Sequence, residues 1–122
     1  MKYIIALLAF ATSAYAHEMT PTYFEIKSSY MEGMSKTKFR LFNRRSDVQY
    51  YEFSAFDKEW NPLPFATTDK LVNIEYLDIK DITIYFRDTD VKKVYYVCTT
   101  SRLLKEDVTS TAIASKICSR IK

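Results

Sequence analysis

The chain has 122 residues, a formal net charge of +3 at pH 7 and a hydrophobic fraction of 48%. This length suits one domain with one hydrophobic core. The charge is small and its basic residues are mixed with acidic ones, which argues against a nucleic-acid partner. Aromatic residues make up 16% of the chain, and Gly occurs once. Because this composition suits half-buried strands, we expect an all-β fold.

The first part of the chain has the features of a signal peptide. Lys2 gives a positive start, residues 4–11 form a short apolar run, and Ala14-Tyr-Ala16 has small residues at a cleavage position. The run is shorter than a permanent membrane span requires. We therefore predict a signal peptide at 1–16 and a domain at 17–122, located in the periplasm or secreted, with no membrane span after cleavage. An uncleaved N-terminal anchor is the alternative.

Alternating polar and apolar residues predict seven strands in the domain. We expect them at 22–27, 36–43, 48–56, 71–76, 81–86, 93–99 and 108–122. Turn residues separate these runs, and no stretch after residue 16 keeps a helical period over three turns. Short, regularly spaced strands in a chain of this length predict an antiparallel β-sandwich.

Two cysteines occupy the last two predicted strands. If these strands are antiparallel neighbours, Cys98 and Cys118 face each other, and a disulfide between them closes a loop of about 20 residues. Export to an oxidising compartment favours this bond. Two separate buried thiols are the alternative. A catalytic thiol is not indicated, because His17 is the only histidine in the chain.

No residue pattern predicts catalysis, a cofactor or a metal site. His17 lacks a second histidine with which to bind copper, so we interpret its position beside the cleavage site as incidental. The carboxylates follow no paired-acid motif, and neither a phosphate-binding glycine loop nor a nucleophile elbow is present. We predict that the protein is not an enzyme and needs no cofactor or metal.

The last predicted strand has two different faces. Ile113, Ser115 and Ile117 share one face, and Cys118 and Lys122 lie on the other. If Cys118 turns towards the core or its neighbouring strand, the two isoleucines project from the opposite side. Apolar residues that alternate along an exposed edge strand can bind a partner by strand addition. The alternative is that these isoleucines are ordinary core residues.

Five segments carry a family resemblance: Met19-Thr-Pro-Thr22, Thr37-Lys-Phe-Arg-Leu-Phe-Asn43, Val48-Gln-Tyr-Tyr-Glu-Phe-Ser-Ala-Phe56, Val94-Tyr-Tyr-Val97 and Ala114-Ser-Lys-Ile-Cys-Ser-Arg-Ile-Lys122. Together with the signal peptide, their order resembles the N-terminal immunoglobulin-like domain of pilus-type periplasmic chaperones. The resemblance implies a seven-stranded immunoglobulin-like, Greek-key sandwich. In that family the last strand of the domain is lent to an incomplete pilus subunit.

The resemblance also implies roles for single residues. Ile113, Ser115 and Ile117 fall where the donor residues lie, and Lys122 falls where a lysine anchors the subunit's terminal carboxylate. Two positions depart from the family: Tyr23 stands in place of an arginine, and residues 87–92 replace an acidic–arginine motif. We also expect no two-domain cleft.

We therefore expect an exported, non-enzymatic protein-binding module that pairs its edge strand with a partner during assembly of a surface or secreted structure. The partner would be an incomplete β-sandwich subunit or another assembly component. The alternative is a small structural β-sandwich protein that stays incorporated in a larger extracellular or particle assembly.

Overall fold

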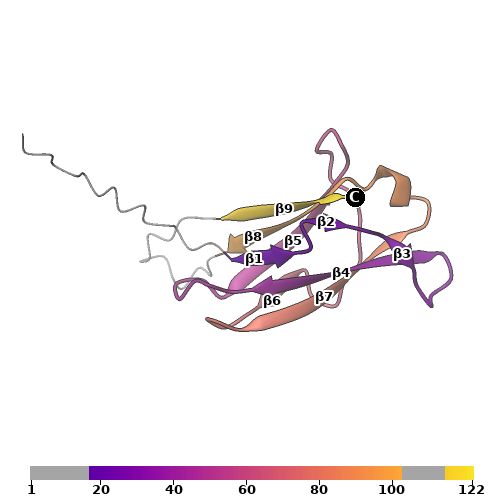
Figure 1. The fold of residues 1–122 in the computed structure, drawn as a ribbon. Coiled ribbons are helices and arrows are strands. Elements are labelled where there is room, and N and C mark those ends of the chain that lie inside the picture. The colour runs from indigo at the N-terminus through magenta and orange to yellow at the C-terminus, as the bar shows by residue number, and fades with distance from the viewer. Residues whose placement is uncertain (1–16, 103–114) are drawn as a thin grey trace, which may run out of the picture.

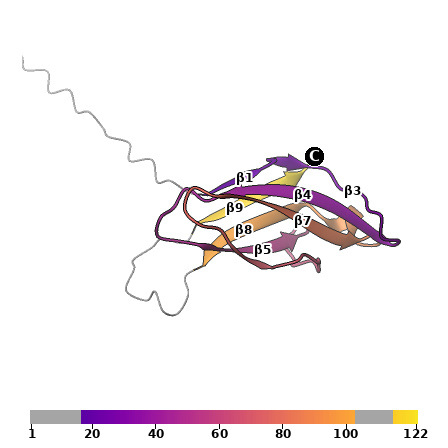
Figure 2. The ribbon, with the colours of Figure 1, turned by 90° about the horizontal axis from the view of Figure 1, so that it is seen from below.

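The computed structural model describes residues 17–102 and 115–122. These residues form two β-sheets packed together, with β4 and β7 in one layer and β5, β8 and β9 in the other (Figures 1 and 2). The predicted all-β class and the β-sandwich are confirmed. In the described part of the chain, no helix has the length and apolar character needed to cross a membrane.

The first sheet is built around β4 (Met34–Phe42), which pairs with β1 (Glu18–Thr20), β3 (Lys27–Ser28) and β7 (Ile79–Arg87). The second sheet has the order β2 (Tyr23–Phe24), β9 (Lys116–Ile121), β8 (Tyr96–Arg102), β5 (Tyr50–Phe56) and β6 (Leu71–Asn73). A short 3-10 helix, η1 (Val91–Lys93), precedes β8. All pairs are antiparallel except β2 with β9.

The predicted seven strands differ from the observed set at both ends of the domain. The strand expected at 22–27 is divided between β2, which pairs with β9 in the second sheet, and β3, which begins at Lys27 and pairs with β4 in the first. Strand β1, which was not predicted, pairs with β4 before the chain crosses at Pro21. Proline suits this crossing, since it cannot donate a backbone hydrogen bond to a ladder. Of the strand expected at 108–122, residues 108–114 lie outside the described residues, and the rest forms β9.

Alternate residues of the long strands fill the space between the sheets. In β4, Phe39 and Leu41 are buried while their neighbours are not, as period-two alternation requires. The rings of Phe24 and Phe53 flank Phe39, with centroids 5.3 and 6.5 Å away. Phe24 comes from β2, so the short crossing strand contributes a fully buried ring to the core.

A buried asparagine joins three segments at one end of the sandwich. The Asn43 side chain donates hydrogen bonds to the carbonyl oxygens of Val48 at 2.7 Å and Ile74 at 2.8 Å. Its oxygen accepts from the Tyr51 hydroxyl and from the Arg45 backbone N–H. Every polar group of the amide is therefore satisfied. Burial raises the pKa of Tyr51 to about 12, so its hydroxyl stays a donor at neutral pH.

We expect Asn43→Ala to lower the free energy of unfolding by about 3 kcal/mol, because it leaves the buried carbonyls and the Tyr51 hydroxyl without partners. Urea denaturation followed by circular dichroism measures the change. The matched control is Asn73→Ala in the exposed part of β6, which should cost about 0.5 kcal/mol or less. Equal effects of the two substitutions would contradict the assigned role of Asn43.

Candidate functional site

Strand β9 is paired along most of its length on one side only, the side of β8. Against β8 it pairs from Lys116 to Arg120, whereas β2 pairs with it only at Arg120 and Ile121. Strand β1 passes near the same side, but its ladder is formed with β4 in the other sheet (Figure 2). Within the described residues, no strand pairs with residues 116–119 on the side away from β8.

The direction of each backbone group in β9 follows from the hydrogen bonds at its two ends. Ser115 accepts a hydrogen bond from β8 and Ile121 donates one to Tyr95, so the odd-numbered residues bond towards β8. The N–H groups of Arg120 and Lys122 instead donate towards β2, to carbonyls at 3.0 and 2.9 Å.

Because sides alternate along a strand, the N–H and C=O groups of Lys116 and Cys118 point to the open edge of β9. We use the term open edge for these backbone groups of residues 116–118. Another strand could form hydrogen bonds with these groups and so extend the second sheet.

The side chain of Ile117 faces inward. It is half-buried and packs against the core, as Ile121 does, and between them Ser119 is buried with its hydroxyl donating to the Pro21 carbonyl at 2.7 Å. The expectation that Ile117 projects away from the core is therefore wrong. The reason is that Cys118 lies on the opposite face, outside the core cluster. Ile113 lies outside the described residues.

Ser115 is held by contacts within the domain. Its backbone N–H donates to the Ser101 hydroxyl at 2.8 Å, and its own hydroxyl lies 3.1 Å from His17 Nδ1. The other ring nitrogen, Nε2, lies 2.7 Å from Thr99 Oγ1. His17 thus connects the start of the described chain to β8 and to the residue before β9.

His17 is a structural core residue, which corrects the interpretation of its position as incidental. It is buried, and its ring centroid lies 4.4 Å from that of Tyr51. Burial and the positive charge of Arg45 lower the pKa of His17 to about 4, so the ring is neutral at physiological pH. No local sequence signal marks this role, because the partners of His17 lie 82 and 98 residues away.

The lowered pKa of His17 predicts a loss of stability between pH 6.5 and 4. In this window the unfolded chain binds a proton at His17 and the folded chain does not, so the free energy of unfolding falls as the pH falls. We expect a loss of about 2 kcal/mol after allowance for solvent screening. Denaturation across this range measures it, and His17→Gln should flatten the curve. An unchanged curve in the variant would assign the pH dependence to other groups.

The predicted disulfide is confirmed. Cys98 and Cys118 are directly opposite on β8 and β9, with an S–S distance of 2.04 Å and a sequence separation of 20. The bond lies in the middle of the paired part of β9, so it fixes the register of that strand against β8.

We expect the double variant Cys98→Ala, Cys118→Ala to lose about 3 kcal/mol of unfolding free energy, because the unfolded chain regains the freedom of the closed loop. Urea denaturation measures the loss, and the wild-type protein under reducing conditions should match the variant. Free thiols in the oxidised protein, detected by alkylation and mass spectrometry, would contradict the bond.

Aromatic rings and a lysine cover the outer face of the second sheet beside the open edge. Trp60 stacks on Tyr96 with ring centroids 3.9 Å apart. The Lys116 amine lies 4.9 Å from the centroid of Phe56 and 5.6 Å from that of Trp60. These cation–π contacts orient the first side chain of β9 along the sheet, away from the open edge.

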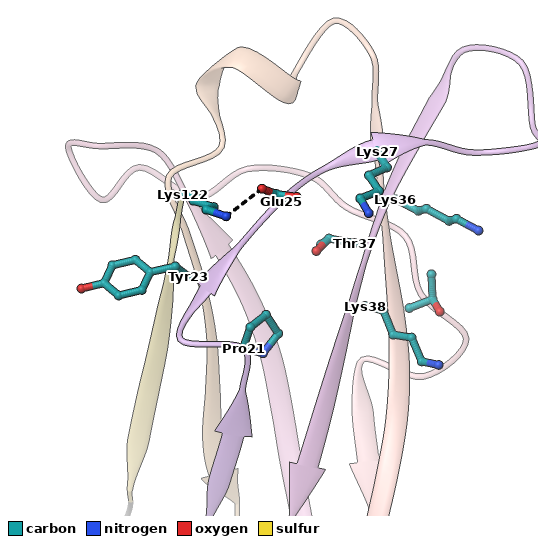
Figure 3. A pocket seen from close by; sticks show the side chains of 9 residues that line it. Pro21, Tyr23, Glu25, Lys27, Lys36, Thr37, Lys38 and Lys122 are labelled. Atoms are coloured by element: carbon teal, nitrogen blue, oxygen red, sulfur yellow. Dashed lines mark ion pairs between the residues drawn. The ribbon is translucent and has the colours of Figure 1, made fainter.

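A groove lies at the other end of β9, between β2 and β4 (Figure 3). Its volume is about 440 Å³, and lysines are its most frequent lining residue. The described lining residues are Pro21, Tyr23, Glu25, Lys27, Lys36, Thr37, Lys38, Thr83 and Lys122. Lys122, which the family resemblance linked to carboxylate binding, therefore lies at a basic groove. Tyr23 lines the same groove, but its ring points away from the lysines of β4, and the Arg120 guanidinium lies 5.3 Å from its centroid (Figure 3).

Lys122 already has an acidic partner in this groove. Its amine lies 3.2 Å from Glu25 Oε1, and both side chains are exposed (Figure 3). An exposed pair of this kind contributes at most about 1 kcal/mol, so an incoming carboxylate could compete with Glu25 for the amine. The sequence did not reveal Glu25 as the partner, because the pair depends on the parallel contact of β2 with β9.

Within residues 17–102 and 115–122, no group of three or more His, Cys, Asp or Glu side chains is placed to hold a metal ion. Comparison with known proteins found no match to a protein-family model, to a curated protein or to a solved structure.

Proposed function

We propose that the protein is an exported, non-enzymatic binding module that pairs the open edge of β9 with a strand of a partner protein, in the manner of the N-terminal domain of pilus-type chaperones. The observation that carries the proposal is that no strand of the described chain pairs with the backbone groups of Lys116 and Cys118 that point away from β8. The disulfide is compatible with a periplasmic or secreted location.

The strand order supports an immunoglobulin-like assignment. In such sandwiches the first, second and fifth strands share one sheet, and the third, sixth and seventh share the other. Here β1, β4 and β7 occupy the first set of places, and β5, β8 and β9 occupy the second. The fourth strand of a constant-type sandwich joins the first sheet, whereas β6 pairs with β5 in the second. The first strand is divided between the two sheets: β1 pairs with β4, and the short strand β2 lies beside the end of β9.

A bound strand would continue the second sheet beyond β9. Its backbone would bond to Lys116 and Cys118, and its inward side chains would cover the half-buried Ile117. Ser115 would contribute less, because its polar groups are already bonded to His17 and Ser101. At the far end, Lys122 would take a partner carboxylate in exchange for Glu25.

We expect Lys116→Pro to reduce partner binding at least about tenfold, because it removes one N–H group of the open edge. The fold should tolerate it, since proline is found on edge strands where its N–H position faces solvent. Retention of partners by the immobilised protein from an exported fraction, quantified by mass spectrometry, measures the effect.

Two further variants serve as controls. Lys116→Gln removes the charge and keeps the N–H, so it should retain binding. Ile117→Pro removes an N–H that faces β8 and should unfold the protein. Partner retention that is equal in Lys116→Pro and wild type would overturn the strand-pairing mechanism. If retained partners never dissociate and the chain is found only in an assembled particle, the structural alternative replaces the chaperone role.

A further inference from the structure

We propose that the basic groove between β2 and β4 is a second binding site, which takes an extended acidic segment of a polypeptide along the edge of β4. The inference does not depend on the open edge of β9. Two independent features carry it: among the described residues Lys27 and Lys36 have no carboxylate partner, and the strands that cover the edge of β4 are interrupted.

The positive charge of the groove is concentrated on β3 and β4. Lys27 and Lys36 are directly opposite in the β3–β4 ladder, where like charges destabilise the pair. Among the residues that the structure describes, neither amine has a carboxylate within ion-pair distance. An anion beside the two amines would relieve this repulsion.

Lys38 adds a third amine that is only weakly neutralised. It lies 3.6 Å from Asp81, but Asp81 already accepts a hydrogen bond from Arg40 at 2.9 Å. Lys122, at the opposite wall, is paired with Glu25. The charge available to a ligand is therefore on the rim formed by Lys27, Lys36 and Lys38, and not at the end of β9.

The edge of β4 is open beside these lysines. Strand β1 pairs with its end at Arg40, and β3 pairs with it up to Lys36, while the chain between them crosses to the other sheet. In the described chain no strand covers residues 37–39 on this side, a gap of roughly 10 Å. The Met34 carbonyl bonds towards β3, so by alternation the backbone of Lys38 points into the gap.

The spacing of the lysines matches an extended peptide. Lys36 and Lys38 lie on the same exposed face of β4, so their Cα atoms repeat at about 7 Å. A strand laid in the gap would lie opposite Lys38, and an acidic residue at its next alternate position would approach Lys27 and Lys36, which face each other in the β3–β4 ladder. Its backbone would bond to Lys38. A phosphate or a membrane surface would satisfy the amines and leave the backbone groups unused.

The test uses a fluorescein-labelled peptide in which Glu alternates with Val, and a matched peptide with Gln in place of Glu. Fluorescence anisotropy measures both affinities. We expect the Glu peptide to bind at least about tenfold more tightly than the Gln peptide, and to weaken as salt is added. Lys27→Gln with Lys36→Gln should lose at least about tenfold in affinity for the Glu peptide.

The control variant is Lys70→Gln with Lys80→Gln, which removes the same charge from exposed positions that do not line the groove. It should leave binding unchanged. Thermal denaturation separates a binding defect from unfolding, because removal of the Lys27–Lys36 repulsion should keep the melting temperature equal or raise it. Amide hydrogen exchange at Lys38 should slow when the Glu peptide is bound.

Three results would overturn the proposal: equal affinity of the two peptides, unchanged affinity of the Lys27 and Lys36 variant, or no protection of the Lys38 amide. Binding of dextran sulfate or of anionic lipid vesicles without binding of the Glu peptide would overturn it as well, in favour of a site for other polyanions. Lys116→Pro should bind the Glu peptide normally, so failure of one site is distinguishable from failure of the other.

Discussion

The crossing of the chain from β1 to β2 is the constraint on which the two open strand edges depend. Before Pro21 the chain covers one end of β4, and after it the chain covers one end of β9. A single segment thus shares its backbone hydrogen bonds between two sheets and completes neither edge. The crossing is anchored by Phe24, whose ring is fully buried, and by the bond from Ser119 to the Pro21 carbonyl. Both proposed binding sites are parts of these two edges.

The alternation of polar and apolar residues was enough to predict the long central strands and the facing cysteines. Strands β4, β5, β7 and β8 each overlap a predicted strand, because one face of each is buried and period two is then visible. Alternation does not say which face is buried when both contain apolar or neutral residues. In β9, Ile117 and Cys118 were both plausible inward residues, and only the packing of the two sheets decides between them.

The polar parts of the candidate sites could not be predicted, because they depend on contacts between distant segments. His17 reaches Thr99 and Ser115 across the domain, and Lys27 meets Lys36 only when β3 pairs with β4. The resemblance to pilus-type chaperones directed attention to Lys122. It gave no indication of Glu25 or of the other lysines in the groove, since these positions carry no motif.

The burial of His17 has a consequence for maturation. If the predicted signal peptide is removed after Ala16, the peptidase must reach a bond whose next residue ends up inside the core. Proteases act on accessible, locally extended backbone. Cleavage would therefore have to precede the packing of His17 against Tyr51 and β8. A chain that folded first would shield its own cleavage site.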